Sequence, residues 1–388
     1  MKERLNRRDF LLQCGRCTLL CAGAGVLGWT LLPETTAAQA LERGRLGRKL
    51  SPYFTALDGG RIRCTLCPRE CEVSKGGRGY CRVRENSDGR YYSLVYGNPC
   101  AVHVDPVEKK PFFHVLPSSL SFSVATAGCN LACKFCQNWE ISQARPDDTL
   151  NYDLPPEQVV EKAVASRCRS IASTYVEPTI FIEYMIDMGT AARKKGILNT
   201  MHSNGYINPA PLEDLCRVLD AACIDLKGFT DDYYRELTEG TLAPVLATLK
   251  KLRQSGVHTE IVNLVVTGKN DDIDGIRAMC RWIRDELGPD VPLHFTRFYP
   301  LYRLKSLEPT PVTTLENAWR AALEEGLHFV YLGNLPGHPA ESTFCPGCKA
   351  RLIERIGFRS TVLGIQDCRC SACGMSIPGI WKDPAAGA

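Results

Sequence analysis

Three cysteines in one short segment carry the strongest chemical signal in the sequence. Cys129, Cys133 and Cys136 have the spacing C-x3-C-x2-C, and an aromatic residue, Phe135, precedes the third cysteine. Thiolates hold iron–sulfur clusters, and a [4Fe–4S] cluster bound by protein alone takes four of them. Three thiolates on one loop therefore predict a [4Fe–4S] cluster with one iron open to a ligand. A zinc site short of one ligand and an electron-transfer cluster with a distant fourth cysteine are the alternatives.

A second group of cysteines precedes this segment. Cys64, Cys67, Cys71 and Cys81 have the spacing C-x2-C-x3-C-x9-C, which places four thiolates within 18 residues. Four thiolates can close around tetrahedral zinc or around an iron–sulfur cluster. The spacing predicts a metal site with a mainly structural role and leaves the metal open. A cluster at this site could relay electrons.

A third group lies near the C-terminus. Cys345 and Cys348 form one C-x2-C pair, and Cys370 and Cys373 form another after 21 intervening residues. Two such pairs are typical of a zinc ribbon, in which four ligands close the site. We expect zinc here to stabilise the module or to dock a partner. The isolated cysteines fit small buried apolar residues; they are Cys100, Cys168, Cys216, Cys223 and Cys280.

The cysteine groups flank a segment of alternating strand and helix patterns. Such alternation predicts parallel strands with crossover helices, and six or more units fit an α/β fold with a full or partial (β/α) barrel. Ligands would gather at the carboxyl ends of its strands. The expected strands are 121–127, 170–174, 198–203, 223–226, 259–266, 293–298 and 328–332, and the expected helices are 156–166, 180–195, 209–219, 233–239, 244–255, 273–287 and 315–325.

The remaining segments complete the expected domain organisation. Residues 1–40 resemble a twin-arginine export signal, because Arg7-Arg8-Asp9-Phe10-Leu11 precedes an uncharged stretch. This signal predicts an exported or membrane-tethered protein. The other expected boundaries are a linker at 41–60, a Cys-rich module with an extended connector at 61–120, the barrel at 121–338, the zinc-ribbon-like module at 341–381 and a tail at 382–388.

Several motifs together resemble the radical S-adenosylmethionine (SAM) enzymes of the pyruvate formate-lyase activating-enzyme type. Within these, the chain is most similar to the radical SAM enzymes of the AmmeMemoRadiSam system, over roughly residues 61–381. The resemblance implies a barrel of the radical SAM type and a SAM molecule chelated by the open iron. Dependence on SAM would favour activity on the cytoplasmic side of the membrane. The matching segments are 64–81, 104–111, 128–142, 174–179, 203–206, 225–227, 333–337 and 345–381.

The resemblance also implies roles for residues at the strand ends. Glu177 stands where relatives hold the SAM amino group, although Tyr175 and Val176 replace the usual glycines. Ser203 and Asn204 match a segment that contacts ribose or carboxylate, and His202 stands where relatives have aspartate. Asp225 and Lys227 end the fourth strand, and Lys227 would face the SAM carboxylate. Tyr299 replaces a histidine common in relatives, and His294 is expected to be structural.

Composition and resemblance together frame the expected function. The activating-enzyme likeness predicts hydrogen abstraction from a protein or peptide, with flavodoxin or ferredoxin as the electron donor. Family membership implies AMMECR1- and Memo-type proteins as functional partners. The net charge is +4, and the first 40 residues supply two of these charges (five basic, three acidic), which argues against a nucleic-acid substrate. An exported electron-transfer or metal-handling protein without SAM chemistry is the alternative.

Overall fold

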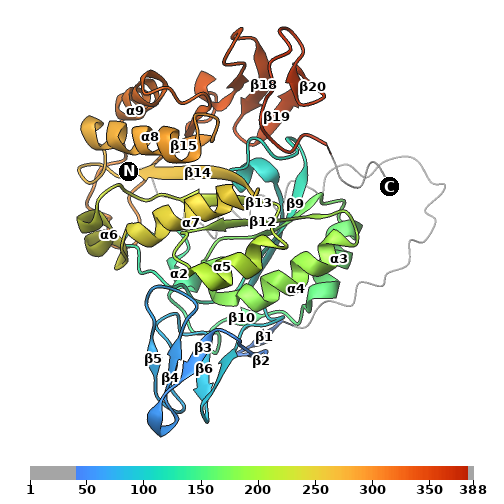
Figure 1. The fold of residues 1–388 in the computed structure, drawn as a ribbon, viewed down its shortest axis with the longest axis vertical. Helices are drawn as coiled ribbons and strands as arrows, with labels where there is room; N and C mark the ends of the chain where they lie inside the picture. The colour runs from blue at the N-terminus through green and yellow to red at the C-terminus, as the bar shows by residue number, and fades with distance from the viewer. Residues whose placement is uncertain (1–40, 383–388) are drawn as a thin grey trace, which may run out of the picture. The chain divides into compact units, whose positions relative to one another are not determined.

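An eight-stranded sheet forms the centre of the computed structural model, which describes residues 41–382 (Figure 1). The strand order is β16-β15-β14-β13-β12-β11-β9-β8, and neighbours from β9 to β16 are parallel. Because β8 and β16 are both edge strands within residues 41–382, the barrel is partial. The strands are β8 (Ala101–Pro106), β9 (Leu120–Ala125), β11 (Ser170–Ser173), β12 (Leu198–Ser203), β13 (Ala221–Asp225), β14 (His258–Val265), β15 (Leu293–Arg297) and β16 (Val330–Gly333).

Helices connect the parallel strands, as the alternating pattern predicts. The first of them, α2, is a single turn, and the expected helix at 180–195 is split into a 3-10 turn, η3 (Pro178–Phe181), and α4. The helices are α2 (Trp139–Ser142), α3 (Pro156–Ala165), α4 (Ile182–Arg193), α5 (Pro209–Cys216), α6 (Asp231–Thr238), α7 (Ala243–Gln254), α8 (Ile273–Leu287) and α9 (Val312–Glu324). Together with the sheet they confirm the predicted α/β fold.

Helix α8 shows how the sequence sets these elements. Asp272 caps its first turn by accepting a hydrogen bond from Gly275 N at 2.6 Å. Gly288, with a φ of 100°, ends it. The buried residues recur at helical spacing and form one apolar face; they are Ile276, Met279, Cys280, Ile283 and Leu287.

The two faces of the sheet bury different partners. In β13, Ala222 and Ile224 join the core that includes the helices, whereas Ala221 and Cys223 face the other side. There they pack with residues of the segment that follows β8, including Phe112. Successive side chains of a strand alternate between faces, which explains the division.

The N-terminal Cys-rich module consists of short antiparallel strands. Residues 41–60, which we expected to form a linker, hold strands that pair with this module and with β10. The connector expected at 101–120 likewise supplies β8 to the central sheet. The strands are β1 (Glu42–Arg43), β2 (Lys49–Leu50), β3 (Phe54–Ala56), β4 (Ile62–Cys64), β5 (Glu72–Val73), β6 (Arg84–Ser87), β7 (Arg90–Ser93) and β10 (Leu150–Asn151).

The C-terminal module follows β16 and is also built of short strands. Figure 1 shows it in red and the N-terminal module in blue, at opposite ends of the central sheet. No helix within residues 41–382 has the length and apolar character that crossing a bilayer requires. The twin-arginine-like segment lies outside the described residues. The strands of the module are β17 (Thr343–Phe344), β18 (Arg351–Ile356), β19 (Arg359–Val362), β20 (Ile365–Gln366) and β21 (Arg369–Cys370).

Candidate active site

The loop that carries Cys129, Cys133 and Cys136 follows β9 and packs on the end of α6. Ala132 N donates to Thr238 O at 3.0 Å, and Lys134 N donates to Leu237 O at 2.9 Å. These bonds satisfy backbone groups of an irregular segment and use carbonyls that the end of a helix leaves free. The three thiols therefore stand at the carboxyl end of the first parallel strand, where barrel ligands gather.

The loop thiols lie in surroundings that require a cation when they ionise. Burial raises the pKa of Cys129 well above its ordinary value, and Glu177 and the neighbouring thiols raise it further. Burial also raises the pKa of Cys133 to about 12, and Lys227 opposes this shift. Only the thiolate binds metal, so the positive charge of bound iron must displace these protons. The three side chains fit a cluster that supplies this charge.

Polar side chains surround the thiol sulfurs. Asn204 Nδ2 lies 3.9 Å from Cys129 Sγ and 2.9 Å from Asn130 Oδ1. Ser142 Oγ lies 3.3 Å from Cys136 Sγ. Hydrogen bonds to cluster sulfurs are one means by which a protein sets a reduction potential. The structure thus brings Asn204, a residue the sequence singled out, directly to the cluster loop.

Glu177 is buried, and protein donors already occupy its carboxylate. Its Oε1 accepts hydrogen bonds from Thr179 N at 2.9 Å and Ser203 Oγ at 2.7 Å, and its Oε2 accepts one from Asn204 N at 2.8 Å. Burial raises the pKa of Glu177, and these donors oppose the shift. The geometry therefore gives Glu177 a positioning role, because it fixes Ser203 and Asn204 beside Cys129.

Tyr175 adopts the backbone conformation that glycine favours. Its φ is 65°, in the left-handed region, where a side chain is uncommon. Its carbonyl accepts a hydrogen bond from Asn138 Nδ2 of the cluster loop at 2.7 Å, and its hydroxyl donates to Asp105. Lys110 lies over its ring at 4.1 Å. The chain therefore keeps the backbone turn without the usual glycine and directs a phenol toward Asp105, a contact the sequence did not indicate.

His202, Asp225 and Lys227, at the carboxyl ends of β12 and β13, form a hydrogen-bonded triad. Asp225 accepts hydrogen bonds from Lys227 Nζ at 2.9 Å and pairs with His202 Nε2 at 2.9 Å. Burial would raise the pKa of Asp225, but Lys227 and His202 lower it instead. Lys227 Nζ lies 5.7 Å from the centre of the Phe135 ring. The triad therefore places a fixed cation beside the cluster loop, while His294 lies elsewhere, buried against Glu260.

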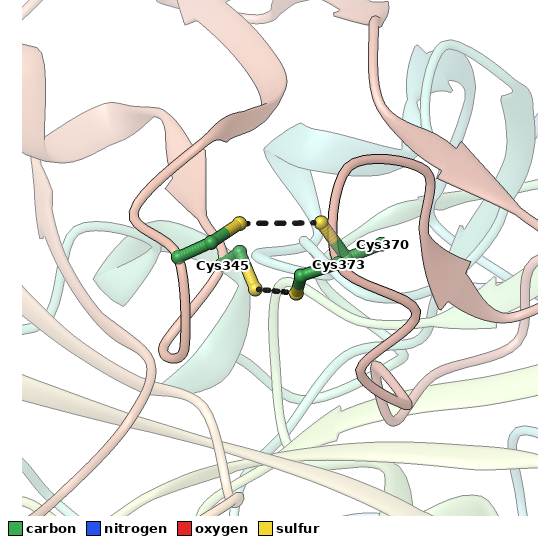
Figure 2. Close-up of side chains that lie close together, drawn as sticks. Cys345, Cys370 and Cys373 are labelled. Atoms are coloured by element: carbon green, nitrogen blue, oxygen red, sulfur yellow. Dashed lines mark hydrogen bonds between the residues drawn. The ribbon is translucent and has the colours of Figure 1, made fainter.

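The four C-terminal cysteines form a compact group (Figure 2). Their sulfur atoms all lie within 4.8 Å of one another, with 3.6 Å between Cys345 and Cys373 and between Cys348 and Cys370. No cysteine of the described chain is in a disulfide. This geometry can hold one metal ion.

The other cysteines divide by environment. Cys64, Cys67 and Cys81 are buried and Cys71 is partly buried, at the junction of β4, β5 and β6. Of the isolated cysteines, Cys168, Cys223 and Cys280 are buried, as expected, and Cys100 and Cys216 are only partly buried.

Comparison with known proteins defines the class of this site. Residues 123–283 match the family described as the Radical SAM superfamily, and they span the cluster loop and the strands around it. Residues 123–283 therefore form a radical SAM domain, as the resemblance implied.

One relative is similar to this chain over nearly its whole length. The chain is 44% identical over 327 residues to "Uncharacterized protein MJ0808" of Methanocaldococcus jannaschii, which covers 84% of this chain and 97% of that protein. It belongs to the same family as that protein.

More distant similarities involve activating enzymes and solved structures. The pyruvate formate-lyase-activating enzyme of Streptococcus mutans is 22% identical over 174 residues, which cover 42% of this chain and 66% of that enzyme. A radical SAM methyltransferase from Sphaerobacter thermophilus superimposes with a TM-score of 0.46 at 14% identity, over 76% of this chain and 81% of that one. A domain of such an activating enzyme from Bacteroides vulgatus gives 0.38 at 13% identity, over 42% and 98% of the two chains.

Proposed function

We propose that this protein is a radical SAM enzyme in which Cys129, Cys133 and Cys136 hold a [4Fe–4S] cluster that binds and cleaves SAM. The observation that carries the proposal is the position of these three thiols at the carboxyl end of β9, beside Asn204 and Lys227. A cluster held by these three thiols would supply one electron to the sulfonium of bound SAM, and cleavage of SAM would then give methionine and a 5′-deoxyadenosyl radical. This radical would abstract hydrogen from the substrate.

The protein residues have separate tasks in this proposal. Asn204 donates toward Cys129 and thereby affects the reduction potential of the cluster. Lys227, fixed by Asp225, supplies a cation that can meet the SAM carboxylate. Phe135, which is buried next to the third cysteine, packs its ring against Tyr233, with centroids 6.4 Å apart.

The test is production of 5′-deoxyadenosine. The chain is purified without oxygen, loaded with iron and sulfide, reduced with dithionite and incubated with SAM. We expect the wild-type protein to release 5′-deoxyadenosine and Cys133→Ala to release none. Cys168→Ala, which removes a buried thiol far in sequence from the loop, is the matched control. A wild-type protein that undergoes reversible redox cycling without cleaving SAM would support the electron-transfer alternative.

We infer a protein or peptide substrate from the similarity to enzymes named as activators of pyruvate formate-lyase. AMMECR1- and Memo-type proteins are the first candidates for functional partners, and flavodoxin or ferredoxin for the electron donor. Incubating the active enzyme in ordinary water with each AMMECR1- or Memo-type protein, produced with deuterium on its carbon atoms, tests the inference, because the radical would take a carbon-bound atom from the substrate. Deuterium returned to 5′-deoxyadenosine, or a mass change in one protein, identifies the substrate, and neither signal with any protein contradicts it.

We propose zinc as the metal of the C-terminal module. Zinc–sulfur distances of about 2.3 Å place tetrahedral thiolates about 3.8 Å apart, close to the separations found here. A closed site of four thiolates leaves no position for chemistry, so its role is stability or docking. The wild-type protein should hold zinc that Cys345→Ala/Cys373→Ala lacks. Equal zinc in the two proteins would refute the assignment.

We also propose that residues 1–40 direct export by the twin-arginine route or tether the protein to the membrane, with turnover on the cytoplasmic side. Replacing Arg7 and Arg8 with lysine should shift the protein to the soluble cytoplasmic fraction of its host. An unchanged distribution would contradict the assignment.

A further inference from the structure

The N-terminal four-cysteine site is formed by the turn between β4 and β5 and by the approach to β6. A backbone N–H points at each sulfur: Leu66 to Cys64, Arg69 to Cys67, Tyr80 to Cys71 and Val83 to Cys81. Cys64, Cys67 and Cys81 are buried, and Cys71 is partly buried. Four such thiols enclosed together are stable as thiolates only around a bound cation. The backbone donors serve thiolates of either zinc or an iron–sulfur cluster.

The grouping of the sulfurs bears on these two possibilities. Among the described residues 41–382, the C-terminal four form a group able to hold one metal ion, with all sulfurs within 4.8 Å of one another. Neither the N-terminal four nor the set Cys129, Cys133 and Cys136 forms such a group. A cluster binds each thiolate through a different iron, so its ligands need not gather around one point. The N-terminal four thus share this feature with the proposed ligands of the first cluster.

A buried hydroxyl points into the same site. Tyr91 is fully buried, and its hydroxyl has the Cys64 thiol as its hydrogen-bonding neighbour. A Cβ placed on Gly79 would be 2.8 Å from the hydroxyl and 3.9 Å from Cys71 Sγ. Buried polar groups normally have partners. Cys64 Sγ, as a ligand of a bound cluster, would be the acceptor for this hydroxyl.

The site lies directly against the cluster loop. A Cβ on Gly128, the residue before Cys129, would clash with Cys81 O, so the two backbones touch. Arg69, between Cys67 and Cys71, donates to Asn130 O of the cluster loop and to Glu239 O at 2.6 Å. Through these contacts, the N-terminal cysteine site packs directly against the loop that carries Cys129, Cys133 and Cys136.

We propose that Cys64, Cys67, Cys71 and Cys81 hold a second iron–sulfur cluster that transfers electrons to the first. The relay step rests on the proposed function, because it requires a first cluster that cleaves SAM. Binding of the second cluster does not depend on the proposed function. In the relay, a one-electron protein donor of the flavodoxin or ferredoxin class reduces the second cluster. The electron then passes across the Cys81–Gly128 contact to the first cluster, and the second cluster returns to its oxidised state. Neither transfer consumes a proton or breaks a bond.

The test uses the full chain and does not require SAM cleavage. Cys129→Ala/Cys133→Ala/Cys136→Ala removes the first cluster and leaves the N-terminal site intact. We expect this triple variant, isolated without oxygen, to keep two to about four iron atoms per chain with equal sulfide, and to give an electron paramagnetic resonance signal on reduction. Adding Cys67→Ala/Cys71→Ala should remove the iron, whereas adding Cys168→Ala should not. A triple variant without iron, or with a second equivalent of zinc, overturns the proposal.

Two further measurements address the relay and the role of Tyr91. In the reduced wild-type protein, adjacent clusters should broaden each other's resonance signals, and the triple variant should lose the broadening. Tyr91→Phe should keep the iron and shift the midpoint potential of the N-terminal cluster to a more negative value, because a hydrogen bond to sulfur is lost. An unbroadened wild-type spectrum with both clusters reduced overturns the relay. An unchanged potential in Tyr91→Phe overturns the assignment of its hydroxyl to the cluster.

Discussion

The two four-cysteine modules have the same number of thiols but different relations to the active site. The C-terminal thiols are compact, and Cys348 and Cys373 are exposed. The N-terminal thiols do not form such a compact group, are mostly buried, and lie next to the cluster loop through Gly128 and Arg69. The number of ligands alone therefore does not set the role of a cysteine site. We infer the role from the grouping of the thiols and from their neighbours, and the proposal accordingly assigns the N-terminal module to the catalytic apparatus and the C-terminal module to stability or docking.

The largest expected effect compares one thiol from each module. Cys67→Ala should lower the rate of SAM cleavage at least about tenfold, equivalent to about 1.4 kcal/mol of activation free energy. It removes the electron path and loosens the Arg69 contact to the cluster loop. Cys373→Ala should leave the rate within about twofold, because the C-terminal module takes no part in the proposed electron path or in SAM binding. Assays of 5′-deoxyadenosine with dithionite and with flavodoxin measure both, and equal losses in the two variants would remove the distinction.

The next effect concerns the ion pair that attaches the N-terminal module to helix α4. Arg84 of β6 is fully buried and forms a bidentate ion pair with Glu183 of α4. Glu183→Ala leaves this guanidinium uncompensated and should lower the free energy of unfolding by about 3–5 kcal/mol. Arg235→Ala, which removes an exposed i,i+4 pair with Asp231, should cost less than about 1 kcal/mol. Urea unfolding of the metal-loaded proteins measures the difference, and similar costs would contradict a buried anchor.

The C-terminal module is attached partly through a buried histidine. His114 Nδ1 donates to Pro378 O at 2.7 Å, and its Nε2 lies 2.7 Å from the Tyr331 hydroxyl. Burial lowers the pKa of His114 to about 3, although Glu260 and the Pro378 carbonyl oppose the shift. The folded protein therefore keeps this ring neutral.

Acid should consequently weaken this attachment. Below about pH 6.5 the unfolded chain takes up a proton on His114 that the folded chain does not, so stability falls as pH falls toward 3. Between pH 7 and pH 5 this residue should account for a loss of about 2 kcal/mol. His114→Gln should reduce the pH dependence by that amount, and His328→Gln, at a more exposed site, should not. Equal slopes in all three proteins would contradict the assignment.

The sequence predicted the features that depend on local pattern. The bounds of β12 and α8 are as expected, because alternation, caps and helical spacing are local signals. The cluster loop follows β9 as expected, and Asn204 and Lys227 lie just after the ends of β12 and β13 as expected. The sequence also predicted that the C-terminal thiols form one group, because paired C-x2-C motifs fix the local turns.

The sequence did not reveal features that depend on distant partners. The segment 41–60 looked like a linker because its strands pair with residues far along the chain. Glu177 matched a ligand position, but whether its oxygens are free depends on Ser203 and Asn204. Arg84 and Glu183 lie 99 residues apart in the sequence, and no local pattern indicates that they form a buried ion pair. These contacts follow from tertiary packing.

The spectrum of the reduced first cluster tests the central claim most directly. Cys67→Ala/Cys71→Ala removes the N-terminal signal, so only the cluster on Cys129, Cys133 and Cys136 contributes. The account predicts that adding SAM changes its electron paramagnetic resonance g-values, because SAM binds the iron that no cysteine covers. A reduced cluster whose spectrum is identical with and without saturating SAM would contradict it.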